Sequence, residues 1–262
     1  MIGAIIGDVA GSRFEFNNTT EHDFEFFHDD CDFTDDTILT IAVAETLVDC
    51  GTAATAEDFK KHILKWCKKY PNPTGAYGGM FAYWLQSPRH EPYQSFGNGA
   101  IMRLSPIVEA AGSLAEAKRL ALECTRITHD HTEALIAAET LISACYQMYH
   151  NAEHKNICNR YLSESYEVLP EFVRGRFNET CQYCLPLAFE IFKNSFNFVD
   201  AIRNAVAFGG DSDTIAAIVG TLAESYYYVP QELEDEVLER FIPEDMKEVI
   251  VKFETKFRRY DR

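Results

Sequence analysis

The sequence contains Gly209-Gly210-Asp211-Ser212-Asp213-Thr214 directly before the apolar run Ile215-Ala216-Ala217-Ile218-Val219-Gly220-Thr221-Leu222. Two carboxylates and their neighbouring hydroxyls therefore precede a run with the composition of a buried helix. Charge at the edge of a core costs roughly several kcal/mol unless it is paired or bound to a metal ion. Asp213 or Ser212 could simply cap the helix. A cap needs one oxygen, however, and this stretch offers more, so we favour a metal site.

A second stretch of the same kind supports this interpretation. Phe33-Thr34-Asp35-Asp36-Thr37 precedes another apolar helical run, Ile38–Leu47. Two such clusters can converge on one site if their helices pack side by side. Oxygen ligands suit Mg²⁺ or Mn²⁺ better than zinc, which prefers His and Cys.

The number of acidic groups favours two ions. Asp35, Asp36, Asp211 and Asp213 carry four negative charges, and Glu15 would add a fifth. One divalent ion neutralises two of these charges, and a pair neutralises four. Taken alone, Glu15 would be a surface residue or a partner of Arg13.

The first fifteen residues predict a helix with a smooth face. Gly3, Gly7 and Gly11 recur every four residues from Met1 to Glu15, which places them on one side of a helix. This face would let another helix approach closely. The spacing is not that of a dinucleotide-binding loop.

The rest of the chain reads as helices joined by loops. Residues 17–36 are acidic but lack the glycine and glutamate of a calcium-binding EF-hand loop, and residues 151–180 are polar and irregular. No period-2 strand stands out. We therefore expect an all-α fold, a single compact multi-helix domain over residues 1–262. The further helices are predicted at residues 57–70, 113–126, 133–149, 184–194, 198–207, 230–240 and 243–258.

Composition excludes several classes of protein. A hydrophobic content of 47% in 262 residues indicates a globular chain with a sizeable core, and a net charge of −17 argues against generic nucleic-acid binding. No segment approaches the ~18 apolar residues of a membrane span. Asp8 interrupts the first apolar run, so we expect no signal peptide and a cytoplasmic protein. Eight scattered cysteines fit reduced packing residues better than disulfides or zinc ligands.

A glycine-rich turn, Gly97-Asn98-Gly99, runs into the apolar segment Ala100-Ile101-Met102. Exposed backbone N–H groups in such a turn can hold a phosphate, although Gly-Asn-Gly is more often only a turn. No Walker lysine motif is present. His129 and His131 lie between two predicted helices, where we expect them to be exposed or hydrogen-bonded rather than metal-bound.

Taken in order, five of these stretches resemble the ADP-ribosylglycohydrolase family, which includes the dinitrogenase reductase-activating glycohydrolases and the hydrolases of ADP-ribosyl-arginine and ADP-ribosyl-serine. They cover the chain from its first helix to about residue 228. The matching pieces are Gly7-Asp8-Val9-Ala10-Gly11-Ser12-Arg13-Phe14-Glu15, Thr34-Asp35-Asp36-Thr37, Gly97-Asn98-Gly99-Ala100-Ile101-Met102-Arg103, Thr128-His129 and Gly209-Gly210-Asp211-Ser212-Asp213-Thr214.

The resemblance implies a fold of this family's type, with two Mg²⁺ or Mn²⁺ ions in a central cleft that bind the ribose hydroxyls. Glu15 would be a ligand, gate or acid/base, and the implied catalytic residues are Glu15, Asp35 and Asp36. The implied metal ligands are Thr34, Asp35, Asp36, Asp211, Asp213 and Thr214. The implied substrate contacts are Gly97, Asn98, Gly99, Ala100, Ile101, Met102 and His129.

The implied reaction is hydrolysis of the glycosidic bond between ADP-ribose and a modified side chain, with arginine favoured. The same site acting on ADP-ribosyl-serine, O-acetyl-ADP-ribose or an ADP-ribosylated nucleobase stays open, as does a non-catalytic ADP-ribose-binding or immunity module. One departure bears on the leaving group. Members often carry a Gly-Tyr segment that contacts the ribose, and here Tyr183 is only a candidate. The partner would be an ADP-ribosylated protein or a small-molecule substrate, and the oligomeric state does not follow.

Overall fold

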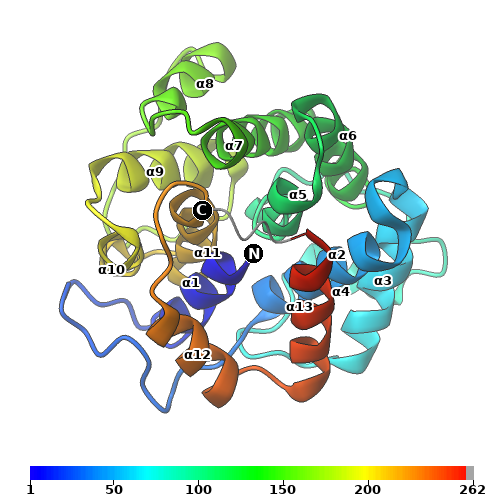
Figure 1. Ribbon diagram of the computed structural model, residues 1–262, viewed down its shortest axis with the longest axis horizontal. Helices are drawn as coiled ribbons and strands as arrows, with labels where there is room; N and C mark the ends of the chain where they lie inside the picture. The colour runs from blue at the N-terminus through cyan, green and yellow to red at the C-terminus, as the bar shows by residue number, and fades with distance from the viewer. Residues whose placement is uncertain (258–262) are drawn as a thin grey trace.

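The computed structural model describes residues 1–257, and within this range the chain forms helices and no sheet (Figure 1). Its two β-bridges, Thr34 with Thr74 and Gly97 with Thr180, are isolated. The all-α prediction is therefore confirmed. The helices are α1 (Ile2–Ser12), α2 (Asp35–Cys50), α3 (Ala56–Lys69), α4 (Gly79–Gln86), α5 (Ser105–Ala110), α6 (Leu114–Thr125), α7 (Thr132–Asn151), α8 (Ile157–Ser165), α9 (Cys181–Asn194), α10 (Phe198–Phe208), α11 (Ser212–Glu224), α12 (Gln231–Arg240) and α13 (Glu244–Phe257).

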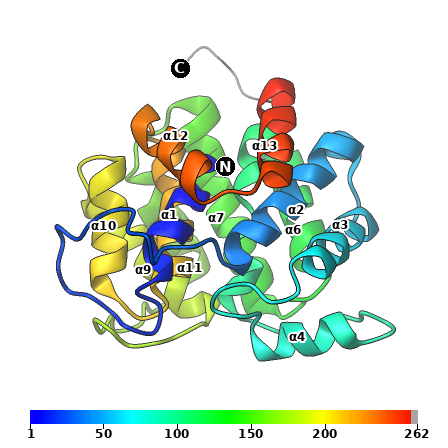
Figure 2. The same cartoon turned by 90° about the horizontal axis from the view of Figure 1, so that it is seen from below.

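The glycine face of α1 packs against α11, the helix that follows the second acidic stretch. A Cβ atom on Gly7 would lie 2.1 Å from the backbone oxygen of Ala216, and one on Gly11 would lie 2.5 Å from the Cα of Asp213. Only glycine permits this approach of two helix backbones. The predicted smooth face is thus confirmed, and it brings the end of α1 to the start of α11 (Figure 2).

Several helix ends follow from local sequence. Thr34 caps α2, since its side-chain oxygen accepts a hydrogen bond from the Asp36 N–H. Thr55 and Asp58 form a capping box at the start of α3. The first helix ends at Ser12, so Glu15 lies in the turn beyond it rather than at the predicted helix end. The predicted end of the last helix, residue 258, lies outside the described residues.

Three helices, α4, α5 and α8, lie outside the predicted ranges. The short helix α4 follows a loop rich in proline and glycine, and α8 lies in the stretch that we read as irregular. In α8, Ile157, Cys158, Tyr161 and Leu162 are buried, so one turn-spaced face packs onto the protein although the surrounding sequence is polar. Packing decides the structure of this segment, because its own sequence signal is short.

The core contains most of the cysteines, and none of the eight forms a disulfide. Cys31, Cys67, Cys124, Cys145, Cys158, Cys181 and Cys184 are buried, as expected for packing residues. Among residues 1–257, no helix combines the length and the apolar character that crossing a bilayer requires.

Candidate metal centre and substrate turn

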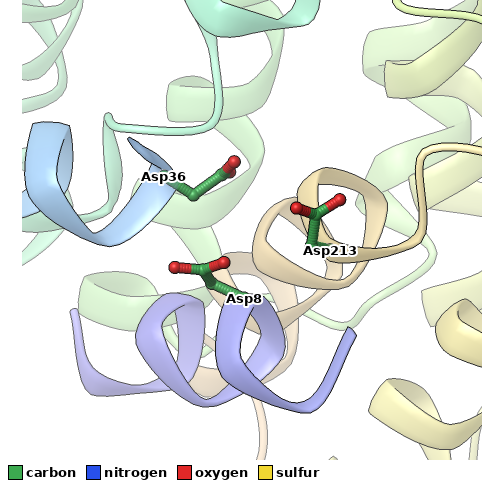
Figure 3. Close-up of side chains that lie close together, drawn as sticks. All are labelled: Asp8, Asp36 and Asp213. Carbon is green, nitrogen blue, oxygen red and sulfur yellow. The ribbon is translucent and has the colours of Figure 1, made fainter. Parts of the chain in front are cut away.

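Three helices bring acidic side chains to one point. Asp8 lies on α1, Asp36 in the first turn of α2 and Asp213 in the first turn of α11, and their side chains lie close together (Figure 3). One ligand-type oxygen from each lies within 4.8 Å of the others. The two acidic stretches, some 175 residues apart in the chain, therefore meet in space as the sequence predicts.

A second group of carboxylates adjoins the first. Oxygens of Glu15, Asp211 and Asp213 also lie within 4.8 Å of one another. Asp213 belongs to both groups, so the two sets of oxygens lie side by side and share one carboxylate. Such a pair of adjacent, oxygen-only sets matches the ligands of hard divalent cations.

The sequence reasoning did not assign Asp8 to the site. Its fully buried carboxylate accepts hydrogen bonds from the backbone N–H and hydroxyl groups of Thr34, at 3.1 and 2.7 Å, and from the same groups of Thr37. Asp8 thus holds the start of α2 against α1. Its position one residue after Gly7, on the face that meets α11, is the signal that could have revealed it.

The alternative that Asp213 or Ser212 caps the helix does not hold, because both residues lie inside α11. Asp211 occupies the N-cap position of α11, but its side chain makes no capping hydrogen bond. Among residues 1–257, no hydrogen-bond partner reaches the buried Oδ1 atoms of Asp36 and Asp213. Buried carboxylate oxygens without donors are costly, and a cation is the partner that would satisfy them. The donor set therefore fits a metal centre.

The pKa of every carboxylate in the centre is raised above its usual value. Burial is the main cause in each case, and neighbouring carboxylates add to it for Glu15, Asp35, Asp36 and Asp213. The pKa of Asp8 rises to about 6 despite its hydrogen bonds, and that of the half-buried Glu15 to about 7. The pKa values of Asp35, Asp36 and Asp213 lie well above the usual range.

The remaining predicted ligands lie at the same helix ends. The Thr214 hydroxyl donates to Asp36 Oδ2 at 3.0 Å and so links the two acidic stretches. The Thr34 hydroxyl donates to Asp8 and caps α2, so it already has two partners. Asp35 belongs to neither close group of oxygens, although the charges of Asp8 and Asp211 affect its pKa. Their roles as ligands remain predictions.

The glycine-rich turn lies beside the acidic centre. Asn98 is buried, and its Nδ2 donates to Asp211 Oδ2 at 2.6 Å. Its backbone N–H donates to the Glu179 carbonyl at 2.6 Å, and Cys181 N–H donates to Phe96 O at 2.9 Å. The segment before α9 therefore holds the turn in place. This support was not foreseen, because the sequence around residue 179 carries no recognisable motif.

The predicted substrate contacts differ in whether their side chains could reach a substrate. The side chains of Ala100, Ile101 and Met102 lie in the core, so only their backbone could face a substrate. His129 is nearly buried, with its Cε1 and Nε2 atoms 3.3 Å from where a Cβ on Gly99 would lie. His131 caps α7 through its side chain, which confirms that it is hydrogen-bonded.

Two loops border the centre. The side chain of Asn18 connects the segment after Glu15 to Gly210. Its amide oxygen accepts from the Gly210 N–H at 2.8 Å, and its amide nitrogen donates to the Gly210 carbonyl at 3.0 Å. A Cβ on Gly75 would lie 2.6 Å from a carboxylate oxygen of Glu15, so the loop before α4 lies directly against this acid. Gly75 has φ of +78°, which favours glycine for a second reason.

Tyr183 does not serve as the missing ribose-contacting tyrosine. Its side chain is 3% exposed, and its hydroxyl donates to the carbonyl of Val173 and accepts from the N–H of the same residue, both at 3.2 Å. It anchors the loop between α8 and α9. The nearby Glu179 is exposed, and its pKa is raised by partial burial and by the charge of Asp211.

Comparisons with known proteins identify relatives of this chain and a solved structure with the same fold. One relative is ADP-ribosyl-[dinitrogen reductase] glycohydrolase of Rhodospirillum rubrum, which is 27% identical over 75% of this chain and 69% of that protein. Another is ADP-ribosylarginine hydrolase Tri1 of Pseudomonas putida (strain GB-1), which is 24% identical over 87% of this chain and 70% of that protein. A solved ADP-ribosylglycohydrolase-related protein complex matches the fold with a TM-score of 0.69 and 23% identity, over 97% of this chain and 95% of that one.

The sequence profile of the ADP-ribosylglycohydrolase family matches residues 1–259, almost the whole length of the chain. The match includes the three helix ends that carry the acidic centre and the turn that contacts it. The chain thus belongs to the ADP-ribosylglycohydrolase family and is a hydrolase of the glycosidic bond.

Proposed function

We propose that this enzyme removes ADP-ribose from a modified protein side chain, and that the modified residue is arginine. The observation that carries the proposal is the pair of adjacent carboxylate groups that share Asp213 and include two buried oxygens without donors. The substrate assignment is supported by the two relatives, whose names specify ADP-ribosyl-dinitrogen reductase and ADP-ribosylarginine. The family match over residues 1–259 also supports one catalytic domain spanning residues 1–262.

We infer that the cofactor is a pair of Mg²⁺ or Mn²⁺ ions. Asp36 and Asp213, with Thr34, Asp35 and Thr214 around them, would hold one side of the pair, and Asp211 would hold the other, with Glu15 beside it. When bound, these ions would polarise the ribose hydroxyls and lower the pKa of an attached water. The six acidic side chains of the centre, Asp8 included, repel one another in a buried place, and the positive charge of two ions would offset much of that repulsion.

Glu15 is the residue that we assign to proton transfer. It is half-buried at the border of the centre, and its pKa of about 7 lets it accept or release a proton at neutral pH. As the glycosidic bond breaks, positive charge develops at C1 of the ribose, and neighbouring carboxylates stabilise such charge. Asp35 and Asp36 contribute to this negative potential from the start of α2.

The turn at Gly97–Gly99 would receive the pyrophosphate. The N–H groups of Gly97, Asn98, Ala100, Ile101 and Met102 already donate within the protein, so Gly99 is the residue that would offer its N–H. His129 presents a ring edge to this glycine. Asn98 joins this turn to Asp211, so the phosphate-binding and sugar-binding regions are fixed relative to each other. A defined distance between the two would position the ribose for cleavage.

The test is release of ADP-ribose from an ADP-ribosyl-arginine protein, assayed with Mg²⁺, with Mn²⁺ and with EDTA. We expect turnover only with a divalent ion. Asp35→Asn and Asp213→Asn should each lower kcat by more than about a hundredfold. In metal sites, even the loss of a residue that only hydrogen-bonds to a ligand lowers metal affinity or activity by about 10–100-fold. Asp23→Ala, which changes a side chain that is 99% exposed, is the matched control.

A substrate panel identifies the leaving group. Parallel assays would use ADP-ribosyl-arginine, ADP-ribosyl-serine, O-acetyl-ADP-ribose and an ADP-ribosylated nucleobase. Preference for any of the last three would refute the arginine assignment and keep the hydrolase. ADP-ribose binding without turnover on the whole panel, with bound metal demonstrated, would instead indicate a non-catalytic binding module.

A further inference from the structure

Arg103 is a charged side chain in the core with an unusual set of partners. It is 0% exposed, yet within residues 1–257 no carboxylate forms a salt bridge with it. Its Nη2 donates to the Cys124 carbonyl at 3.2 Å and to the Thr128 hydroxyl at 2.9 Å. A buried guanidinium is costly to maintain, so its orientation toward Thr128 calls for an explanation.

The hydrogen bond from Arg103 determines what Thr128 can do next. Arginine only donates, so the Thr128 oxygen is the acceptor and its own hydrogen remains available. His129 Nδ1 lies 2.7 Å from that oxygen. Thr128 is also 0% exposed, and no other acceptor within residues 1–257 reaches its hydroxyl. If Nδ1 carried the proton, the threonine hydrogen would be buried without a partner, which is unfavourable.

The geometry therefore requires Thr128 to donate to Nδ1, so that the imidazole proton resides on Nε2. Protonation of both nitrogens is opposed, since burial and the neighbouring charge of Arg103 place the pKa of His129 well below its usual value. The Tyr93 ring, centred 5.9 Å from the imidazole, adds no opposite charge.

The other edge of the ring faces the glycine-rich turn. His129 Nε2 lies 3.7 Å from where a Cβ on Gly97 would lie and 3.3 Å from the corresponding point on Gly99. Within residues 1–257 this nitrogen has no hydrogen-bond partner, although the residue is only 5% exposed. A polar atom of this buried residue is thus directed at the turn with its hydrogen free.

We propose that Arg103, acting through Thr128, is a positioning residue that holds His129 as the neutral Nε2–H tautomer, which donates to a phosphate oxygen bound at the Gly97–Gly99 turn. The tautomer part stands on the free protein alone. The phosphate part rests on the proposed function, because it takes ADP-ribose as the bound molecule. A neutral donor keeps its hydrogen throughout the neutral pH range, unlike an ordinary histidine.

The first test is long-range ¹H–¹⁵N NMR on the full chain with Mg²⁺ at pH 7. The His129 signal is identified as the one lost in His129→Gln. We expect a single tautomer with a protonated Nε2 and an unprotonated Nδ1. An Nδ1–H tautomer, or a doubly protonated ring, would overturn the inference. This readout needs no substrate, so it succeeds or fails independently of the enzymatic activity.

The second test separates positioning from folding. In Thr128→Val the ring should show mixed tautomers, and the Kd for ADP-ribose should rise about tenfold or more, as expected for a lost hydrogen bond to a charged group. Thr128→Ser restores the hydroxyl and should restore both readouts. Thr46→Val, which removes another fully buried threonine hydroxyl far along α2, should change neither. An unaltered tautomer and Kd in Thr128→Val would refute the role of Arg103 and Thr128.

Discussion

Replacing Gly7 by alanine is the most direct test of how the fold builds the acidic centre. The added Cβ would lie 2.1 Å from the oxygen and 2.4 Å from the carbon of the Ala216 carbonyl, whereas ordinary contacts begin near 3.4 Å. Because both sides are helix backbone, no side-chain rotation relieves the clash. The axes of α1 and α11 must separate by roughly 1.3 Å at this point to restore normal contact distances.

That separation has an energetic and a functional cost. Overpacking costs about 1–3 kcal/mol, and alanine regains about 1 kcal/mol of helix propensity. Since rigid backbone lies on both sides, we expect the upper end, a net loss of about 2 kcal/mol and a Tm about 4–8 °C lower. The same movement carries Asp8 away from Asp213, which spreads the oxygens that now lie within 4.8 Å. The Kd for Mn²⁺ should therefore rise by about tenfold or more.

Differential scanning calorimetry and isothermal titration with Mn²⁺ measure the two effects. The titration is run well below the Tm of the variant, so that loss of affinity does not reflect unfolding. The matched control is Gly79→Ala at the start of α4, where an added Cβ meets no heavy atom within 4 Å. If Gly7→Ala kept both the Tm and the Mn²⁺ affinity of the unchanged protein, close helix packing would not be what shapes the centre.

Three further predictions concern charge in the centre. When folding raises the pKa of an acid, the folded protein loses stability as the pH rises from the unfolded to the folded pKa of that acid. For Asp8 and Glu15 this pH window runs from about 4 to about 7. For Asp8 alone, the rise in pKa from 3.8 to about 6 corresponds to about 3 kcal/mol of unfolding free energy. The difference in unfolding free energy between Mn²⁺ and EDTA, from urea titrations, should thus grow from pH 5 to pH 8, and a constant difference would contradict the assignment. Asp213→Asn should unfold at higher urea than the unchanged protein in EDTA at pH 8 while losing Mn²⁺ binding by calorimetry; lower stability there would mean that repulsion is not dominant. Asn98→Ala removes the hydrogen bond to Asp211 and should lower kcat/KM by about tenfold to a hundredfold, an effect that unchanged kinetics would disprove.

Much of this architecture follows from the sequence because the deciding interactions are local or periodic. The four-residue spacing of glycines in α1 predicts a closely packed partner, and a pair of acidic stretches, each heading an apolar helix, predicts their convergence. In each case the residue types and their order determine the structure nearly by themselves.

The parts that were missed depend on contacts between distant segments. Asp8 looks like a break in an apolar run, and only the placement of α2 shows that its carboxylate is used four times as an acceptor. The support of the Gly97–Gly99 turn by Glu179 and Cys181 is a backbone pairing, which leaves no mark on side-chain pattern. The unpredicted helix α8 is likewise stabilised by packing rather than by its own propensity.

The double use of Asp8 matters for anyone who tries to improve this protein. The carboxylate fastens the first turn of α2 and also adds to the crowding of negative charge around Asp213. A screen for thermal stability carried out in chelator would therefore select neutral replacements of Asp36 and Asp213, which are more stable but inactive. The same screen with a divalent cation present throughout would select the opposite variants. The most heat-resistant proteins would then be those that keep the acidic residues of the centre.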